Sequence, residues 1–196
     1  MPSDLYSKKY NIRFFHCPKC AMTSVRHVIG CEWTNIKEIP NDAKNLFVYR
    51  DILDRFVSSY FQIRKTYKSH QIKHLKKNFI RDISGELILK IKTNPSDYLN
   101  EIIKNGFWDS HQLPQIYYAN EIYERNYQKI DDLIMFEDVD SYFLKLGVIK
   151  NKKRNVNHHP EKESVLNFFK TKSKEINYLY KEDLVLKDIK WSQEKD

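Results

Sequence analysis

The chain has 196 residues, with 34 lysines and arginines against 26 aspartates and glutamates, and a formal net charge of +8. This length suits one domain with its own core and makes a stabilising disulfide framework unnecessary. The three cysteines are odd in number and close together, and no segment approaches the roughly 20 apolar residues of a membrane span. We therefore expect a cytoplasmic protein, and the positive charge suits a nucleic acid, a membrane surface or an acidic small molecule as partner.

The first half of the chain alternates apolar runs with helical patterns. Residues 11–17 (NIRFFHC) predict a buried strand that ends in a turn, and residues 44–50 (KNLFVYR) predict a second strand. An amphipathic helical pattern follows each of them. The apolar positions on these two helices are Val25, Val28, Ile29, Phe56, Tyr60 and Ile63. Strand, helix, strand and helix in this order favour a βαβ unit and a parallel sheet.

The second half is mostly helical, and internal repeats are absent. A helix over 94–105 is expected to be capped by Asn94 or Ser96 and to stop at Gly106. The further predictions, in chain order, are a helix over 69–83, a strand over 131–139, a short helix that ends at Gly147, a basic loop over 151–160, an amphipathic helix over 161–184 and a frayed tail over 190–196. The pattern predicts one α/β domain over 1–196, with its core at about 10–187 and a central parallel β-sheet flanked by helices.

The stretch from residue 17 to residue 31 permits three interpretations. Cys17, Cys20, His27 and Cys31 are spaced C-x2-C-x6-H-x3-C, which offers four zinc donors in an uncommon spacing. In the second interpretation, Thr23 and Ser24 begin a helix whose positive end, together with Lys19, holds a phosphate or sulfate. In the third, the two hydroxyl residues only cap the helix. A Walker A loop is excluded because both of its glycines are missing.

A second anion site is predicted from residues 46–62. Arg50 follows the second strand, and Ser58 lies two turns into the next helix, so both can face the same edge of the sheet. A guanidinium group offers two parallel donors to an anion, and a serine hydroxyl adds a third.

These two segments resemble a known enzyme family. P-K-C-x-x-T-S at 18–24 and V-x-R-D-x-x-x-R-x-x-S-x-Y at 48–60 are similar to the phosphate-binding signatures of sulfotransferases that use 3′-phosphoadenosine 5′-phosphosulfate (PAPS). The segment YRDILDRFVSSY (49–60) is most similar to the carbohydrate sulfotransferases of the chondroitin, HNK-1 and heparan 2-O type. Further similarities follow in the order of the family, in HQLPQ (111–115), MFEDV (135–139), NVNHHP (155–160) and INYLYKEDLVL (176–186). Ile52 stands where the family has proline, and fewer residues separate Lys19 from Arg50 than the family pattern leads us to expect.

The resemblance implies a P-loop-NTPase-like sulfotransferase fold and an activity. The enzyme would move a sulfuryl group from PAPS to an acceptor hydroxyl, leaving adenosine 3′,5′-bisphosphate, with no metal and no nucleic acid involved. The family implies a carbohydrate acceptor, and lipid, small-molecule and peptide tyrosine acceptors stay open. Lys19 would be catalytic, because it would place positive charge on the leaving phosphate. The implied cofactor-binding residues are Pro18, Lys19, Cys20, Ala21, Met22, Thr23, Ser24, Arg50 and Ser58.

The general base is expected to be His111, because imidazole titrates near neutral pH. Glu32 and Glu38, which follow the first helix, are the alternatives. Gln115 would either orient the acceptor or cap a turn. Arg55 is expected to pair with an acidic neighbour, Glu137 and Asp183 to support the scaffold, and Lys152, Lys153, Arg154 and Asn157 to form a loop over the nucleotide phosphates or a solvated turn.

Two alternative functions stay open at this point. One is a nucleic-acid-binding module with zinc at Cys17, Cys20, His27 and Cys31. The other is a sulfotransferase-like fold that binds PAPS without turnover.

Overall fold

The computed structural model describes residues 3–15, 17–20, 22–66, 80–81, 83–124, 130–148 and 160–188. The chain divides into two compact units. The sheet unit comprises Met1–Asp51, Gln115–Asn157 and Glu182–Asp196, and the helical unit comprises Ile52–Pro114 and His158–Lys181. Within the described parts of both units, no helix is long and apolar enough to cross a bilayer. The expectation of one domain over 1–196 stays a prediction.

The sheet unit is built on a five-stranded mixed sheet. Its strands are β1 (Ser3–Ser7), β2 (Ile12–Phe15), β3 (Glu32–Asn35), β4 (Lys44–Tyr49) and β5 (Asp132–Met135), in the order β3-β1-β2-β4-β5. β2, β4 and β5 are parallel, whereas β1 is antiparallel to both β2 and β3. The α/β class is thereby confirmed, and so are the three predicted strands. The prediction of a parallel sheet is wrong for one side of the sheet. There, β1 pairs antiparallel with both β2 and β3.

Local sequence explains why the parallel strands can be predicted from the sequence and β1 cannot. Every residue of β2 and the centre of β4 are buried, which fits continuous apolar runs in parallel strands covered on both faces. β1 has the sequence SDLYS and pairs with β2 in a hairpin. Its Asp4 accepts hydrogen bonds from Nε and Nη2 of Arg13 at 2.9 and 2.6 Å, and both side chains are buried. β1 therefore neutralises a cation that β2 could not bury alone.

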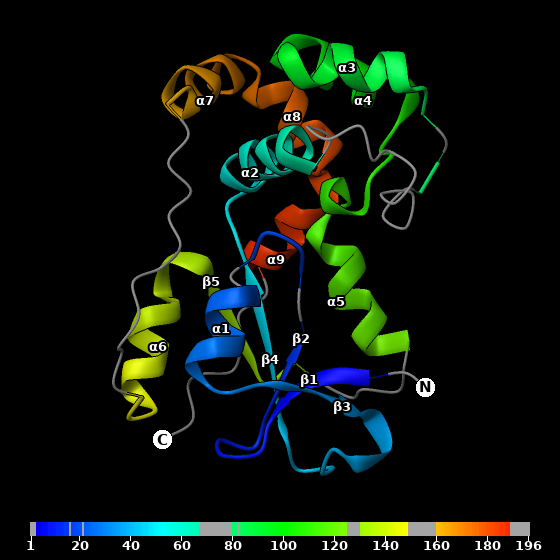
Figure 1. The fold of residues 1–196 in the computed structure, drawn as a ribbon. Coiled ribbons are helices and arrows are strands. Elements are labelled where there is room, and N and C mark those ends of the chain that lie inside the picture. The colour runs from blue at the N-terminus through cyan, green and yellow to red at the C-terminus, as the bar shows by residue number, and fades with distance from the viewer. Residues whose placement is uncertain are drawn as a thin grey trace. The chain divides into compact units, whose positions relative to one another are not determined.

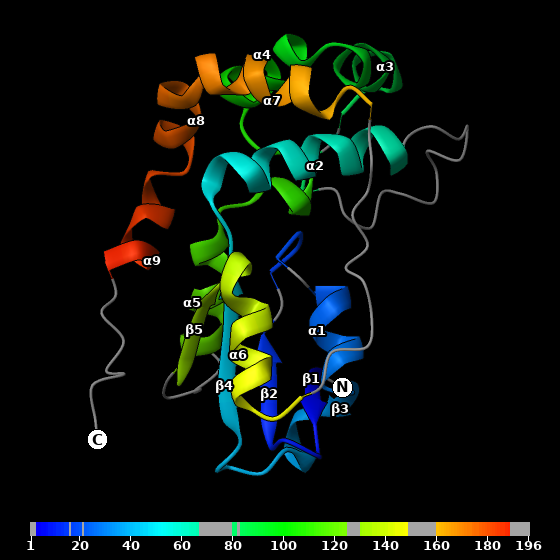
Figure 2. The same ribbon diagram turned by 90° about the vertical axis from the view of Figure 1, so that its left-hand side faces the viewer.

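Helices cover both faces of this sheet. α1 (Met22–Val28) and α6 (Val139–Lys145) lie on one face and α5 (Gln115–Glu124) on the other, as Figure 1 and Figure 2 show. Short 3-10 turns η1 (Ile36–Glu38), η5 (Phe136–Asp138) and η6 (Lys181–Leu184) and the helix α9 (Val185–Asp188) complete the described regular structure of the unit. The core joins Phe14, Phe47 and Val48 of the strands to Val25 of α1 and Phe143 of α6.

The described part of the helical unit contains no strand. Its elements are α2 (Ile52–Thr66), α3 (Gly85–Thr93), α4 (Pro95–Asn105), η4 (Ser110–Gln112), α7 (Lys162–Thr171) and α8 (Ser173–Leu179). The predicted helix over 161–184 is therefore interrupted at Lys172. Most of the helix expected over 69–83, residues 151–159 of the basic loop expected over 151–160, and the tail over 190–196 lie outside the described residues.

Aromatic side chains hold the helical unit together. Phe56 of α2 packs edge-on against Phe169 of α7 with ring centroids 4.9 Å apart, and its ring lies 5.3 Å from that of Tyr98 on α4. Tyr60 also contacts both partners. Edge-to-face pairs stabilise a core beyond simple area burial. The apolar face predicted for α2 is confirmed, because Phe56, Tyr60 and Ile63 are all buried.

The end of α4 provides a test of the backbone geometry. Asn94 caps the helix with its side chain, as predicted, and Gly106 ends it with φ 78° and ψ 179°. This region of backbone space is essentially restricted to glycine. A Cβ atom at Gly106 would meet nothing within 4 Å, so the cost of a side chain there is conformational. We expect Gly106→Ala to lower the free energy of unfolding by about 1 to 2 kcal/mol, measured by urea denaturation.

Gly85→Ala is the matched control in the same unit. Gly85 begins α3, where alanine is the better helix former. We expect it to raise the free energy of unfolding by up to about 1 kcal/mol. Equal effects of the two substitutions would contradict the assigned backbone conformation at Gly106.

Candidate functional site

The turn after β2 holds Lys19 in an unusual backbone conformation. The Cys20 N–H donates to the Cys17 carbonyl at 3.1 Å, Pro18 occupies the second position of the turn, and Lys19 at the third has φ 70°. A positive φ at the third position with proline at the second is typical of a type II turn, where glycine is usual. A lysine in this conformation costs conformational energy. The local sequence offers no compensation for that cost.

Arg50 lies beside this turn. Its Nη1 donates to the Lys19 carbonyl at 3.4 Å, although the two residues are 31 positions apart in the chain. The guanidinium group lies 4.6 Å from the centroid of the Phe136 ring at the end of β5. Its Nε is buried and has no hydrogen-bond partner among the described residues. The structure thus brings Lys19 and Arg50 together at the carboxyl edge of the parallel strands, where ligands of open α/β sheets bind.

The side chain of Gln115 fixes the position of Arg50. Its Oε1 accepts the Arg50 N–H at 2.7 Å, and its Nε2 donates to the Arg50 carbonyl at 2.8 Å. The same Oε1 accepts the Cys20 thiol at 3.1 Å. Gln115 is only 1% exposed. A buried amide of this kind satisfies the backbone of Arg50 as a neighbouring strand would, so its role is structural support of the turn and of Arg50.

Asp183 in turn holds Gln115. One carboxylate oxygen accepts the Ile116 N–H at 2.9 Å, and the other lies 3.4 Å from Gln115 Nε2. The carboxylate is buried and sits at the first turn of α5, where a negative charge is favourable. The scaffold role expected for Asp183 agrees with this position. Glu137 is exposed in η5.

The remaining residues of the predicted phosphate loop surround the start of α1. Thr23 is exposed, and Ser24 and Pro18 are partly exposed. The Cys20 side chain is fully buried, so it offers an anion its backbone alone. Met22 is the first residue of α1, and Ala21 lies outside the described residues. The first turn of α1 contains no acidic residue that would repel an anion.

The three cysteines belong to the core of the sheet unit. Among the described residues, Cys17, Cys20 and Cys31 form no disulfide and are buried, whereas His27 is exposed. Burial raises the pKa of the Cys31 thiol to about 12, opposed in part by the charge of Arg26. The described residues contain no group of three or more histidine, cysteine or acidic side chains that could hold a metal ion. This arrangement gives the zinc alternative no support.

Ser58 and His111 belong to the helical unit. Ser58 is partly buried on α2, and Arg55 one turn before it is 1% exposed. The predicted sharing of one anion by Arg50 and Ser58 joins residues of the two units and stays a prediction. Glu32 and Glu38, the alternative bases, are exposed at the start of β3 and in η1. Lys152, Lys153, Arg154 and Asn157 lie outside the described residues.

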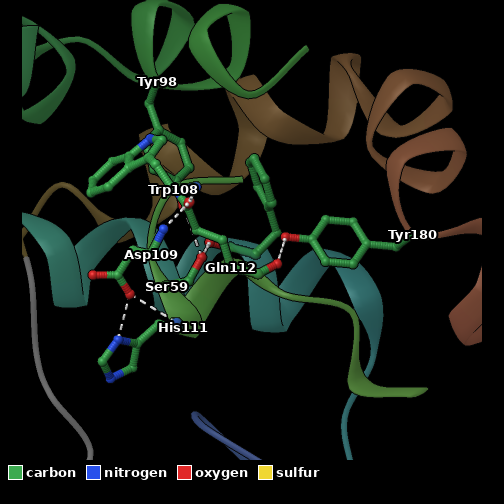
Figure 3. Close-up of polar contacts among 8 residues, drawn as sticks. Ser59, Tyr98, Trp108, Asp109, His111, Gln112 and Tyr180 are labelled. Atoms are coloured by element: carbon green, nitrogen blue, oxygen red, sulfur yellow. Dashed lines mark hydrogen bonds and ion pairs between the residues drawn. The ribbon is translucent and has the colours of Figure 1, made fainter. Parts of the chain in front are cut away.

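His111 is paired with a buried carboxylate that the sequence did not single out. Oδ1 of Asp109 lies 2.7 Å from Nδ1 of His111 and accepts the His111 backbone N–H at 2.8 Å. Figure 3 shows this pair beside Trp108 and Gln112. The DSH spacing, an N-cap aspartate two residues before a histidine, is the only sequence signal that could have revealed it.

A second polar contact lies in the same unit. The hydroxyls of Ser59 and Tyr98 are 3.0 Å apart and buried (Figure 3). Burial raises the pKa of the Tyr98 phenol well above its usual range, and the hydrogen bond with Ser59 offsets only part of this effect. Tyr98 therefore stays neutral and acts as a structural hydrogen-bonding group.

The two hydrogen bonds between the Gln115 amide and the Arg50 backbone, called the Gln115 clamp here, lead to a stability prediction. Gln115→Leu keeps the volume but leaves the Arg50 N–H and C=O groups without partners in a buried place. We expect the free energy of unfolding to fall by about 3 kcal/mol, measured by urea denaturation. Asn41→Ala, at an exposed position in the same unit, should change it by less than about 0.5 kcal/mol. A Gln115→Leu variant as stable as the unmodified protein would show that the clamp contributes nothing.

Comparison of the chain with models of protein families, with curated proteins and with solved structures found no match. The α/β class with a mixed sheet is established by the structure of this chain itself. The resemblance to PAPS-dependent sulfotransferases therefore depends on the sequence motifs around Lys19, Arg50 and His111.

Proposed function

We propose that this chain is a sulfotransferase that moves a sulfuryl group from PAPS to a hydroxyl acceptor on a carbohydrate. The observation that carries the proposal is the contact between Arg50 and the Lys19 turn. The two motifs that resemble the family signatures each contribute one basic residue, and both residues follow the carboxyl ends of parallel strands. An edge with two cations suits a ligand that carries several negative charges.

The residues present at this edge fit such a ligand chemically. Lysine and arginine provide the charge, and Thr23 and Ser24 provide hydroxyl donors in the first turn of α1. The buried Nε of Arg50 has a hydrogen atom to donate and no acceptor among the described residues. A buried donor of this kind costs free energy until a ligand or a water accepts from it. We therefore assign the anionic groups of the donor nucleotide to this edge.

Each proposed residue has one task. Lys19 stabilises the negative charge that develops on the leaving phosphate oxygen. Arg50 binds a phosphate through its guanidinium group, and Phe136 supports that group from one side. His111 accepts the proton of the acceptor hydroxyl. PAPS supplies the activated sulfuryl group, and the net charge of +8 suits an anionic glycan as acceptor.

Ligand-dependent stability tests the nucleotide assignment. We expect adenosine 3′,5′-bisphosphate to raise the melting temperature more than adenosine 5′-phosphate or ATP does. A ligand at a hundredfold excess over its Kd stabilises the native state by about 2.7 kcal/mol. Equal shifts with all three nucleotides would refute PAPS recognition. A shift with the bisphosphate but no transfer from PAPS to desulfated chondroitin or heparan would favour a binding protein without turnover.

Lys19→Gly separates the charge of Lys19 from its backbone strain. Glycine adopts the positive φ of this position freely, so stability without ligand should stay within about 1 kcal/mol of the unmodified protein or exceed it. The shift with adenosine 3′,5′-bisphosphate should nevertheless fall by more than half. Lys37→Ala, which removes one exposed charge from η1 of the same unit, should keep the full shift. An unchanged shift in Lys19→Gly would remove Lys19 from the proposed site.

A further inference from the structure

The imidazole of His111 is held from one side by a carboxylate that is almost completely buried. Asp109 Oδ1 lies 2.7 Å from Nδ1, and the side chains are 2% and 21% exposed for Asp109 and His111. In Figure 3 the rest of the ring extends away from the carboxylate. The ring therefore has one nitrogen against a buried anion and the other directed elsewhere.

The carboxylate is itself held in place. Gln112 Oε1 accepts the N–H groups of Trp108 and Asp109 at 2.9 and 3.0 Å, and Asp109 caps η4. The Tyr180 hydroxyl donates to the Gln112 carbonyl at 2.5 Å (Figure 3). Gln112 is fully buried and Tyr180 is 1% exposed. Moving Asp109 away from His111 would break several buried hydrogen bonds, so the pair is preorganised.

The chemistry of the two groups determines where the proton lies. An ionised carboxylate only accepts hydrogen bonds, so a neutral imidazole beside it carries its proton on Nδ1. Nε2 then has the free electron pair. Nε2 can then accept a proton while Nδ1 stays against Asp109. Asp109 thus orients the base.

We propose that Asp109 is a positioning residue for His111 and that the pair adapts the enzyme to aliphatic, carbohydrate-type hydroxyl acceptors. This inference rests on the proposed function. An alcohol holds its proton far more tightly than a phenol, whose pKa is about 10. An alcohol therefore needs a strong, oriented base during transfer, and an acidic phenol does not.

The proposed step conserves atoms and charge. The O–H bond of the acceptor breaks, and its proton goes to Nε2 of His111. The acceptor oxygen forms a bond to sulfur, while the bond between sulfur and the 5′-phosphate oxygen breaks. The electron pair of that bond stays on the phosphate of adenosine 3′,5′-bisphosphate. The imidazolium ion beside Asp109 then returns its proton to water.

Asp109→Asn is the most informative variant. Asparagine is as good a helix N-cap as aspartate and has the same shape, so η4 should keep its structure. Only the negative charge is removed. Asp97→Asn, which makes the same change in the first turn of α4, is the matched control and should match the unmodified protein in every assay.

The kinetic experiment uses desulfated chondroitin and 4-nitrophenol as the two acceptors. We expect Asp109→Asn to lower kcat for chondroitin on the order of 10²-fold and to change kcat for 4-nitrophenol less than about threefold. The melting shift with adenosine 3′,5′-bisphosphate should stay unchanged. In a His111→Ala background, Asp109→Asn should have no further effect, because it acts through the imidazole. Equal losses for both acceptors, or additive losses, would overturn the inference.

Nitrogen NMR of the imidazole tests the positioning without any turnover. Long-range ¹H–¹⁵N spectra of the neutral ring should show the Nδ1–H tautomer for His111, assigned by its disappearance in His111→Gln. The Nε2–H tautomer in the unmodified protein would overturn the inference even if the enzyme is active.

The same experiments distinguish the inference from the proposed function. Nucleotides that all stabilise the protein equally would refute PAPS recognition, and the tautomer would still decide whether Asp109 positions His111. Bisphosphate binding without transfer to either acceptor would overturn the role of the pair as a base and leave nucleotide recognition intact.

Discussion

The hydrogen bonds between the Gln115 amide and the backbone of Arg50 are the constraint on which the sheet-edge site depends. Beyond the last paired residue of β4, the N–H and C=O groups of Arg50 need partners, and the buried amide supplies both. Because Gln115 also accepts the Cys20 thiol and contacts Asp183, the turn after β2, the end of β4 and the start of α5 are fixed together. The direction of the Arg50 guanidinium follows from this support.

A second glutamine plays the corresponding part in the helical unit. Gln112 accepts two backbone N–H groups and thereby fixes Asp109, which holds His111. Gln112 and Gln115 both come from the HQLPQ segment, which passes from the helical unit into the sheet unit between Pro114 and Gln115. One short segment therefore organises the polar groups of both units. Its buried amides support two partly exposed side chains, those of Arg50 and His111.

The cysteines, the most conspicuous feature of the sequence, are buried in the core of the sheet unit. The C-x2-C pair at Cys17 and Cys20 lies in the apolar core with Cys31. The Cys20 thiol also donates to Gln115 Oε1. The residue between the two cysteines that carries the charge, Lys19, is partly exposed and has a strained backbone. Strain of this kind persists only where the surroundings impose it. The tight turn and the clamp by Gln115 provide those surroundings.

The sequence by itself determined the α/β class, the three buried strands and the capped helix over 95–105. These follow from local patterns such as continuous apolar runs, N-cap residues and glycine stops. It could not determine the antiparallel strands β1 and β3, the pairing of Asp4 with Arg13 or the partners of Gln115 and Asp109. β1 is short and polar, and its position depends on the pairing of its Asp4 with the buried Arg13 of β2. Only the tertiary structure decided which buried polar groups meet, because hydrogen-bond partners far apart in the chain leave no periodic signal in the sequence.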